Sequence, residues 1–149
     1  MFKKILVPLD GSQMAESALN EVRVLAQEAA AEMVLVHVNV PIASRYYPGV
    51  LPDVVEIERD MSAESNRYLQ RVATTLNERN IRTTTVQLDD PAVADAILNY
   101  ADHNGVDLIA MSTHGRSGIG RWLLGSVADR VIHGAKVPVL LVRPDLSTP

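Results

Sequence analysis

Two short segments of the sequence carry residue types that can bind a sugar or an anion. The first runs from Pro8 to Ser12, reads Pro-Leu-Asp-Gly-Ser and follows a short apolar run. Ser12 can accept a hydrogen bond from a free amide at the start of a helix. Asp10 has two interpretations: a turn residue that stabilises the corner, which the local sequence favours, or a carboxylate that accepts a hydrogen bond from a ribose or base.

The second segment is richer in glycine and in hydrogen-bond donors. Three glycines fall within six residues of the stretch 112–121, which also holds Arg116, Ser117 and Arg121. Glycines allow backbone amides to approach a ligand closely, and successive amides in such a loop form a concave anion site. Glycine alone is weak evidence, because neither a P-loop nor a GxGxxG fingerprint is present.

A glycine-serine pair also lies at the expected start of the last helix. Gly125, Ser126 and Val127 lie where unpaired amides and the helix dipole favour phosphate. Ser126 and Asp129 also fit a capping box, so a plain helix cap is the alternative interpretation. The two interpretations are compatible, since Ser126 could cap the empty helix and meet phosphate when a ligand is present.

The remaining polar candidates are scattered. The four histidines form no pair with metal-ligand spacing, so we expect no protein-made metal site. His37 is expected to be a satisfied core or crevice histidine, whereas His114 could contact a phosphate when protonated. Tyr46 and Tyr47 could cover an adenine ring or simply be exposed, and the irregular stretch 41–52 that holds them is either a lid or a mobile loop.

Strand-length apolar or β-branched runs alternate with segments in which apolar residues recur every three or four positions. The predicted strands are Ile5–Val7, Met33–Val38, Ile81–Leu88, Leu108–Met111 and Val137–Val142. The predicted helices cover 15–29, 57–76, 94–101 and 127–132; Asp90 is the expected cap of the third, and the last ends near Gly134. The third strand is polar enough for a sheet edge, and Pro138, which lacks a donor, places the last strand at an edge too.

This alternation predicts an α/β fold with one domain over residues 1–149. The chain is 149 residues long with a formal net charge of −4 and no cysteine. We expect an open five-stranded parallel sheet with helices on both faces. In such a sheet, ligands bind beyond the carboxyl ends of the strands where the winding reverses, and both polar segments are expected there.

The sequence resembles the universal stress protein family along almost its whole length. The stretch 5–12 resembles the family's first strand and turn, Leu35–Val38 its second strand, and 111–144 its final third. The ATP-binding branch has a pattern of glycine, two residues, glycine, nine residues, glycine, then serine or threonine. Gly115, Gly125 and the following serine fit it, whereas Ser112 stands where the pattern has its first glycine.

The resemblance implies the strand order 3-2-1-4-5 of adenine-nucleotide α-hydrolase-like proteins and a site for ATP, AMP or ADP, with Mg²⁺ carried on the nucleotide. In this resemblance Pro8 and Asp10 line the adenosine pocket, and Val38 offers backbone hydrogen bonds to adenine. Ser112 lies near the ribose, and the phosphates are held by Gly115, Gly125, Ser126 and Val127. The predicted site comprises Pro8, Asp10, Gly11, Ser12, Val38, Met111, Ser112, His114, Gly115, Arg116, Ser117, Gly118, Gly125, Ser126 and Val127.

The function expected from these residues is that of an ATP-binding regulatory or stress-response protein. We expect at most slow hydrolysis, because no strong general base is evident beyond Asp10 and His114. The alternatives are a nucleotidyl-transferase-like enzyme and a dimeric protein that acts through partners without nucleotide. The resemblance implies a homodimer through Val137–Val142, and the protein partner is unidentified. We expect a cytoplasmic protein that binds neither nucleic acid nor membrane.

Overall fold

The computed structural model describes residues 1–42, 52–114 and 124–144. The predicted site residues Gly115, Arg116, Ser117 and Gly118, together with Tyr46 and Tyr47, lie outside the described residues. The strands are β1 (Lys4–Pro8), β2 (Glu32–Asn39), β3 (Thr83–Asp89), β4 (Leu108–Ser112) and β5 (Val139–Val142). The helices are α1 (Gln13–Ala29), α2 (Pro52–Asn77), α3 (Val93–His103) and α4 (Ser126–Gly134).

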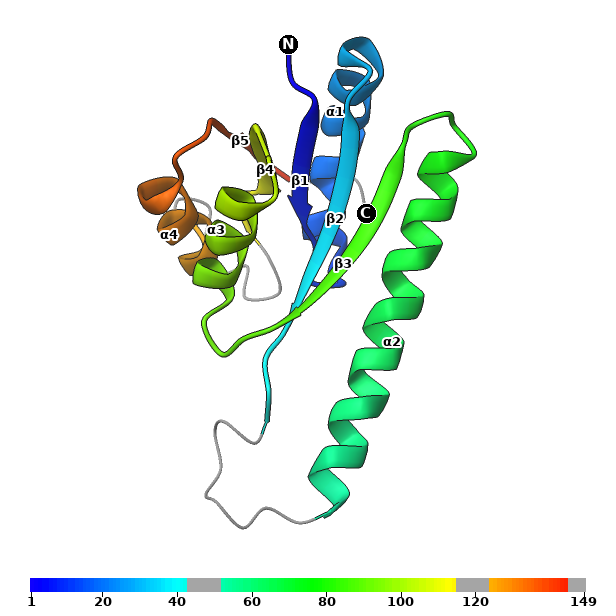
Figure 1. Ribbon diagram of the computed structural model, residues 1–149, viewed down its shortest axis with the longest axis vertical. Coiled ribbons are helices and arrows are strands. Elements are labelled where there is room, and N and C mark those ends of the chain that lie inside the picture. The colour runs from blue at the N-terminus through cyan, green and yellow to red at the C-terminus, as the bar shows by residue number, and fades with distance from the viewer. Residues whose placement is uncertain (43–51, 115–123, 145–149) are drawn as a thin grey trace.

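The five strands form one parallel sheet in the order β3-β2-β1-β4-β5 (Figure 1). The pairing of β1 with β2 runs from Lys4 opposite Glu32 to Pro8 opposite Val36, and each remaining pair is also parallel. The predicted fold class and strand order are therefore confirmed. β3 and β5 lie at the two edges, as the threonines of β3 and Pro138, directly before β5, indicated.

Side chains alternate between two hydrophobic cores, one on each face of the sheet. Ile5 and Val7 of β1 pack with α1 and α2, whereas Leu6 packs with α3 and α4. Each of these three side chains is fully buried. Continuous apolar runs form strands here because helices cover both faces, so every position along the strand is interior.

The winding of the sheet reverses between β1 and β4. After β1 the chain moves outward through β2 and β3, with α1 and α2 on one face; α3 then crosses to β4, and α3 and α4 cover the other face (Figure 1). The turns after β1 and β4 consequently diverge toward opposite faces and leave a crevice at their carboxyl ends.

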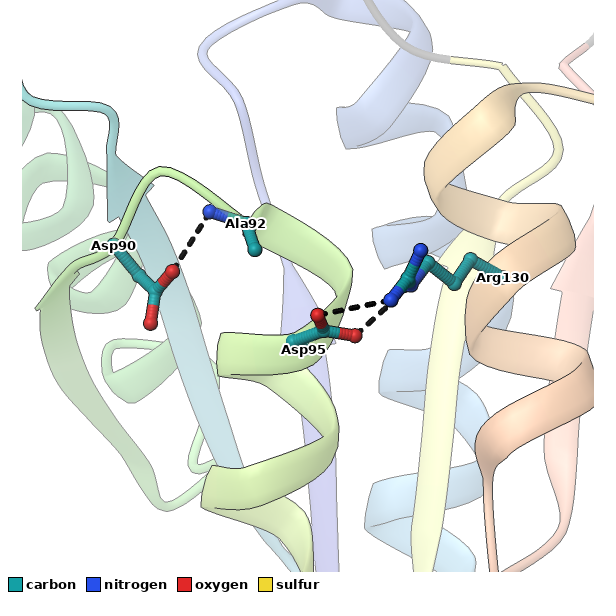
Figure 2. Close-up of polar contacts among 4 residues, drawn as sticks. All are labelled: Asp90, Ala92, Asp95 and Arg130. Carbon is teal, nitrogen blue, oxygen red and sulfur yellow. Dashed lines mark hydrogen bonds and ion pairs between the residues drawn. The ribbon is translucent and has the colours of Figure 1, made fainter. Parts of the chain in front are cut away.

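Three predicted details of the helix starts need correction or extension. Asp90 is not the cap of α3: Ala92 holds that position, and the Asp90 carboxylate accepts a hydrogen bond from the Ala92 amide at 2.7 Å (Figure 2). Ser126 is not the cap of α4 and no capping box forms, because the helix starts one residue earlier, with Gly125 as its cap. α2 begins at Pro52, five residues before the first apolar position of its pattern.

Side-chain contacts hold α4 against α3 at several points. Arg130 donates two hydrogen bonds, of 2.9 and 3.0 Å, to the carboxylate of Asp95 (Figure 2). Lys136, two residues beyond the end of α4, contacts Asp102 of α3 at 2.5 Å. Gly134 permits the close approach between them, because a Cβ at this position would lie 2.5 Å from a methyl carbon of Leu98. These contacts pack α4 closely against α3.

Candidate functional site

A cavity of about 1230 Å³ lies at the carboxyl ends of the strands. Its walls come from the turn after β1, the ends of β2 and β4, the first turn of α4 and the inner side of α2. It therefore occupies the crevice that the reversal of winding creates. This volume exceeds the roughly 300–1000 Å³ of typical small-molecule sites, so a nucleotide can be accommodated.

The turn after β1 is held by its own side chains. The Asp10 carboxylate accepts hydrogen bonds from the Ser12 amide at 2.9 Å and from the Ser12 hydroxyl at 2.6 Å. Ser12 in turn caps α1 by accepting from the Ala15 amide at 3.1 Å. The predicted cap is confirmed and the turn role of Asp10 is present, while Asp10 also lines the cavity.

The start of α4 has the opposite character. Gly125 donates its amide to the Thr113 carbonyl at 2.9 Å, which ties the helix to the end of β4. The first bond within the helix runs from the Asp129 amide to the Gly125 carbonyl, and no side chain in the described ranges caps this end. The amides of Ser126, Val127 and Ala128 thus find no acceptor among the described residues, and all three residues line the cavity.

Gly125 is required where it lies. A Cβ at this position would come within 3.2 Å of the Thr113 carbonyl oxygen, closer than side-chain carbons normally approach. The glycine therefore lets the amino-terminal end of α4 sit directly against β4. Unpaired amides at a helix start also carry the positive end of the helix dipole, so this wall of the cavity suits an anion.

The end of β4 supplies polar groups beside these amides. Ser112 is buried, and its hydroxyl accepts a hydrogen bond from the His114 amide at 3.3 Å. The Thr113 hydroxyl lies 2.9 Å from Nδ1 of His114. Nε2 of His114 is buried and has no hydrogen-bond partner in the described part of the chain.

The end of β2 forms another wall, and its pairing with the β1 turn stops early. The Leu9 amide donates to the Val36 carbonyl at 2.8 Å, the last main-chain bond between the two segments. The Leu9 carbonyl lies 2.8 Å from Nδ1 of His37. Because a carbonyl only accepts, Nδ1 carries the proton. His37 is thus a satisfied crevice histidine, as predicted.

α2 closes the cavity on the remaining side, which the sequence did not indicate. Tyr68 lines the cavity, and its buried hydroxyl lies near Glu16 without the geometry of a full hydrogen bond. Burial raises the pKa of the Tyr68 phenol most, and the nearby Glu16 and Asp10 carboxylates raise it further. Arg71 lies 5.6 Å from the centre of the Tyr68 ring. This wall was missed because the helical pattern marks Tyr68 simply as a core position.

Most of the predicted site residues that the structure describes meet at this cavity. The lining includes Pro8, Asp10, Gly11, Val38, Met111, Ser112, His114, Gly125, Ser126 and Val127. Ser12 is the exception, since it acts behind the wall as the α1 cap. Within the described residues, no three His, Cys, Asp or Glu side chains gather as a metal site, and no helix is long and apolar enough to cross a membrane.

The comparisons with known proteins agree on one family. The model of the universal stress protein family matches residues 1–143. Universal stress protein YxiE of Bacillus subtilis is 32% identical, with 96% of this chain and 100% of that protein covered. The solved structure of MJ0577, a universal stress protein of Methanocaldococcus jannaschii, superposes with a TM-score of 0.85 at 30% identity, covering 99% of each chain.

Two further solved structures share the fold at lower identity. One is a universal stress protein in complex with cAMP, with a TM-score of 0.69, 21% identity and coverage of 97% and 98% of the two chains. The other is the universal stress protein from Archaeoglobus fulgidus in complex with dAMP, with a TM-score of 0.67, 20% identity and coverage of 94% and 97%. From the family match and the closely covered relatives, the chain belongs to the universal stress protein family.

Proposed function

We propose that this universal stress protein binds ATP in the cavity and works as a nucleotide-dependent regulatory protein in a stress response. The observation that carries the proposal is the set of three amides, Ser126 to Ala128, that line the cavity at the start of α4 and have no acceptor within the described part of the chain. A phosphate group supplies the acceptors that these amides lack, and its charge meets the positive end of the helix dipole.

The remaining walls suit the nucleoside. Pro8, Val38 and Met111 supply apolar surface for a base, while Asp10 and Ser112 supply polar groups for a ribose. Relatives of the same fold have been solved with cAMP and with dAMP, which motivates adenine as the base. At 20–21% identity those likenesses concern the fold alone, so the proposal rests on the cavity. Gly115, Arg116, Ser117 and Gly118 are proposed as further phosphate contacts on sequence grounds.

The proposed mechanism is binding with at most slow hydrolysis. Fast phosphoryl transfer needs positioned charges around the γ-phosphate and an oriented nucleophile. Asp10 already accepts two hydrogen bonds from Ser12, which leaves it a poor base for activating water. Mg²⁺ is proposed to arrive on the nucleotide and keep several waters. Turnover above about 1 per second, the low end for ordinary enzymes, would contradict this assignment.

We also propose that two copies pair through residues 137–142 and that the protein works in the cytoplasm as a single domain over residues 1–149. β5 is an edge strand whose four residues are all half-buried, so its outer backbone groups can pair with a second β5. Sedimentation at twice the chain mass supports this pairing, and a monomer at millimolar concentration rejects it.

Mass spectrometry of small molecules released from the purified protein, followed by calorimetry with ATP, tests the proposal. We expect an adenine nucleotide to be released and one ATP to bind per chain. A Gly125→Glu variant should lose this binding, because its carboxylate enters the proposed phosphate position. A stripped wild-type protein that gives no heat with millimolar ATP would instead favour a nucleotide-independent protein that acts through partners.

A further inference from the structure

The hydrogen-bonding direction of β2 alternates regularly along the strand. The Met33 amide donates to the backbone carbonyl of Arg82, and the Asn39 carbonyl accepts from the backbone amide of Asp90. Both of these groups of β2 therefore face β3. The backbone groups of the even-numbered residues face β1 instead. The Glu32 amide donates to the Lys3 carbonyl, and the Val36 carbonyl accepts from the Leu9 amide. By this alternation, the N–H and C=O of Val38 point toward the turn after β1.

The parallel ladder would normally continue by one more step at this point. After the bond from the Leu9 amide to the Val36 carbonyl, the next partner of the Val38 amide is the Leu9 carbonyl. That carbonyl instead accepts a hydrogen bond of 2.8 Å from Nδ1 of His37. The imidazole therefore substitutes for the Val38 amide, and no described residue accepts from that amide.

The Val38 carbonyl is left open by a second feature. Its ladder partner would be the Gly11 amide, but Gly11 has a φ of 84°. This left-handed conformation turns the chain away from β2 toward α1. Val38 lines the cavity, and neither its N–H nor its C=O has a main-chain partner among residues 1–42, 52–114 and 124–144 on this side of the strand.

We propose that His37 is a positioning residue which holds the Leu9 carbonyl away from Val38 and so keeps one backbone donor and one backbone acceptor free to read the base. This inference rests on the proposed function, since it concerns the same cavity. A purine that offers an acceptor nitrogen beside an amino donor matches the pair of groups on Val38. His37 lies at the cavity wall, but its side chain is on the α1 and α2 side of the strand, opposite to Val38, and its Nδ1 is already bonded to the Leu9 carbonyl. Its proposed effect on the base is therefore exerted through the backbone of Val38.

The proposal includes a rule for base selection. Adenine presents a ring-nitrogen acceptor beside an amino donor, whereas guanine presents a carbonyl oxygen in place of that amino group. The Val38 carbonyl would then face another acceptor, and the base would lose a hydrogen bond. A matched pair of such bonds discriminates between bases by at least about tenfold. We expect ATP to be preferred over GTP by that factor.

Three variants test the role of His37 with ATP and GTP titrations. His37→Phe keeps a ring but removes the Nδ1 donor, which releases the Leu9 carbonyl to bond the Val38 amide. His37→Asn places an amide nitrogen near the position of Nδ1 and should preserve the bond. Gln87→Leu is the matched control, because Gln87 lies opposite His37 on β3, donates a similar bond of 2.9 Å to the Ser62 carbonyl and does not line the cavity.

We expect His37→Phe to weaken ATP binding about tenfold and to remove the preference over GTP, with the thermal midpoint of the empty protein unchanged or raised. His37→Asn should retain the wild-type preference, and so should Gln87→Leu. The inference is overturned if wild type binds ATP while His37→Phe keeps its ATP/GTP ratio, or if His37→Asn behaves like His37→Phe. A wild-type protein that binds no nucleotide would overturn the proposed function and this inference together.

Discussion

The two helices that start at the cavity differ in how their first amides are satisfied. At α1 the chain closes the end itself: Ser12 caps the Ala15 amide and Asp10 holds Ser12. At α4 no side chain caps the end, and three amides lining the cavity have no acceptor among the described residues. The start of α1 is satisfied by its own side chains, whereas the start of α4 keeps three amides that no residue of the described ranges satisfies.

This difference separates stability from affinity. A helix start capped by its own side chain contributes to folding whether or not a ligand is present. Unpaired amides that face a cavity add little to folding but bind an anion strongly when it arrives. Substitutions at the start of α1 should therefore change mainly the free energy of unfolding, and substitutions at the start of α4 mainly the affinity for ATP.

The largest expected effect comes from Ser126→Asp. Its carboxylate would lie beside the bound phosphate, and such like-charge contacts cost several kcal/mol, so we expect ATP affinity to fall by about a hundredfold in calorimetry. The free energy of unfolding of the empty protein should rise by about 0.3–1 kcal/mol, because a carboxylate in the first turn favours the helix dipole. Unchanged ATP affinity in a folded variant would show that the phosphate does not bind at this helix start.

The next effect is at the closed start and appears in stability alone. Ser12→Ala removes the cap and the hydroxyl bond to Asp10 but keeps the bond from the backbone amide, so the free energy of unfolding should fall by about 1 kcal/mol in urea titrations. ATP affinity should stay within about twofold of wild type, since Ser12 does not line the cavity. Ser17→Ala is the matched control, because this serine lies inside the same helix and its hydroxyl donates to the Met14 carbonyl. A tenfold loss of ATP affinity in Ser12→Ala would contradict the proposal that the start of α1 affects stability but not ATP binding.

How far these two starts could be predicted from the sequence depends on the range of the contacts involved. The Ser12 cap was predictable, because both partners lie within one turn. The start of α4 was predicted one residue late, because the bond between Gly125 and Thr113 joins residues separated by a whole loop. The His37 bond to Leu9 links residues 28 positions apart, and no local pattern encodes it.

The fold was more predictable than the walls of the cavity. Strands buried on both faces read as apolar runs, so β1, β2 and β4 appear directly in the sequence. The role of α2 as a wall was not predictable, because its core stripe continues through Tyr68 without any change of period. Periodicity identifies the buried face of a helix but not where that face meets a cavity instead of a core.

A smaller effect is expected at the contacts between α3 and α4. Asp95→Asn weakens the paired hydrogen bonds from Arg130 (Figure 2), but the two side chains are 41% and 66% exposed, so the loss of stability should stay below about 1 kcal/mol. The loss should shrink further in about 1 M salt, which screens exposed charges. A change in ATP affinity would show instead that this pair positions α4 for phosphate.

The smallest effect at neutral pH is expected from Tyr68→Phe, and it should grow in alkali. Burial and the nearby carboxylates raise the pKa of the folded Tyr68 above its usual value of about 10. The unfolded chain therefore releases this proton first, so the contribution is complete below about pH 10 and is lost as the pH rises toward the folded pKa. Urea titrations should show a shallower alkaline loss of stability in the variant than in wild type, and identical slopes would contradict this assignment.

The most direct measurement follows the backbone amides themselves during an ATP titration by ¹⁵N-resolved NMR. The amide resonances of Ser126, Val127 and Ala128 should move with a single saturating curve, while those of Gln13 to Ala15 at the start of α1 move less. Saturation of ATP binding with the α4 amides unmoved would contradict the claim that this open helix start receives the phosphate.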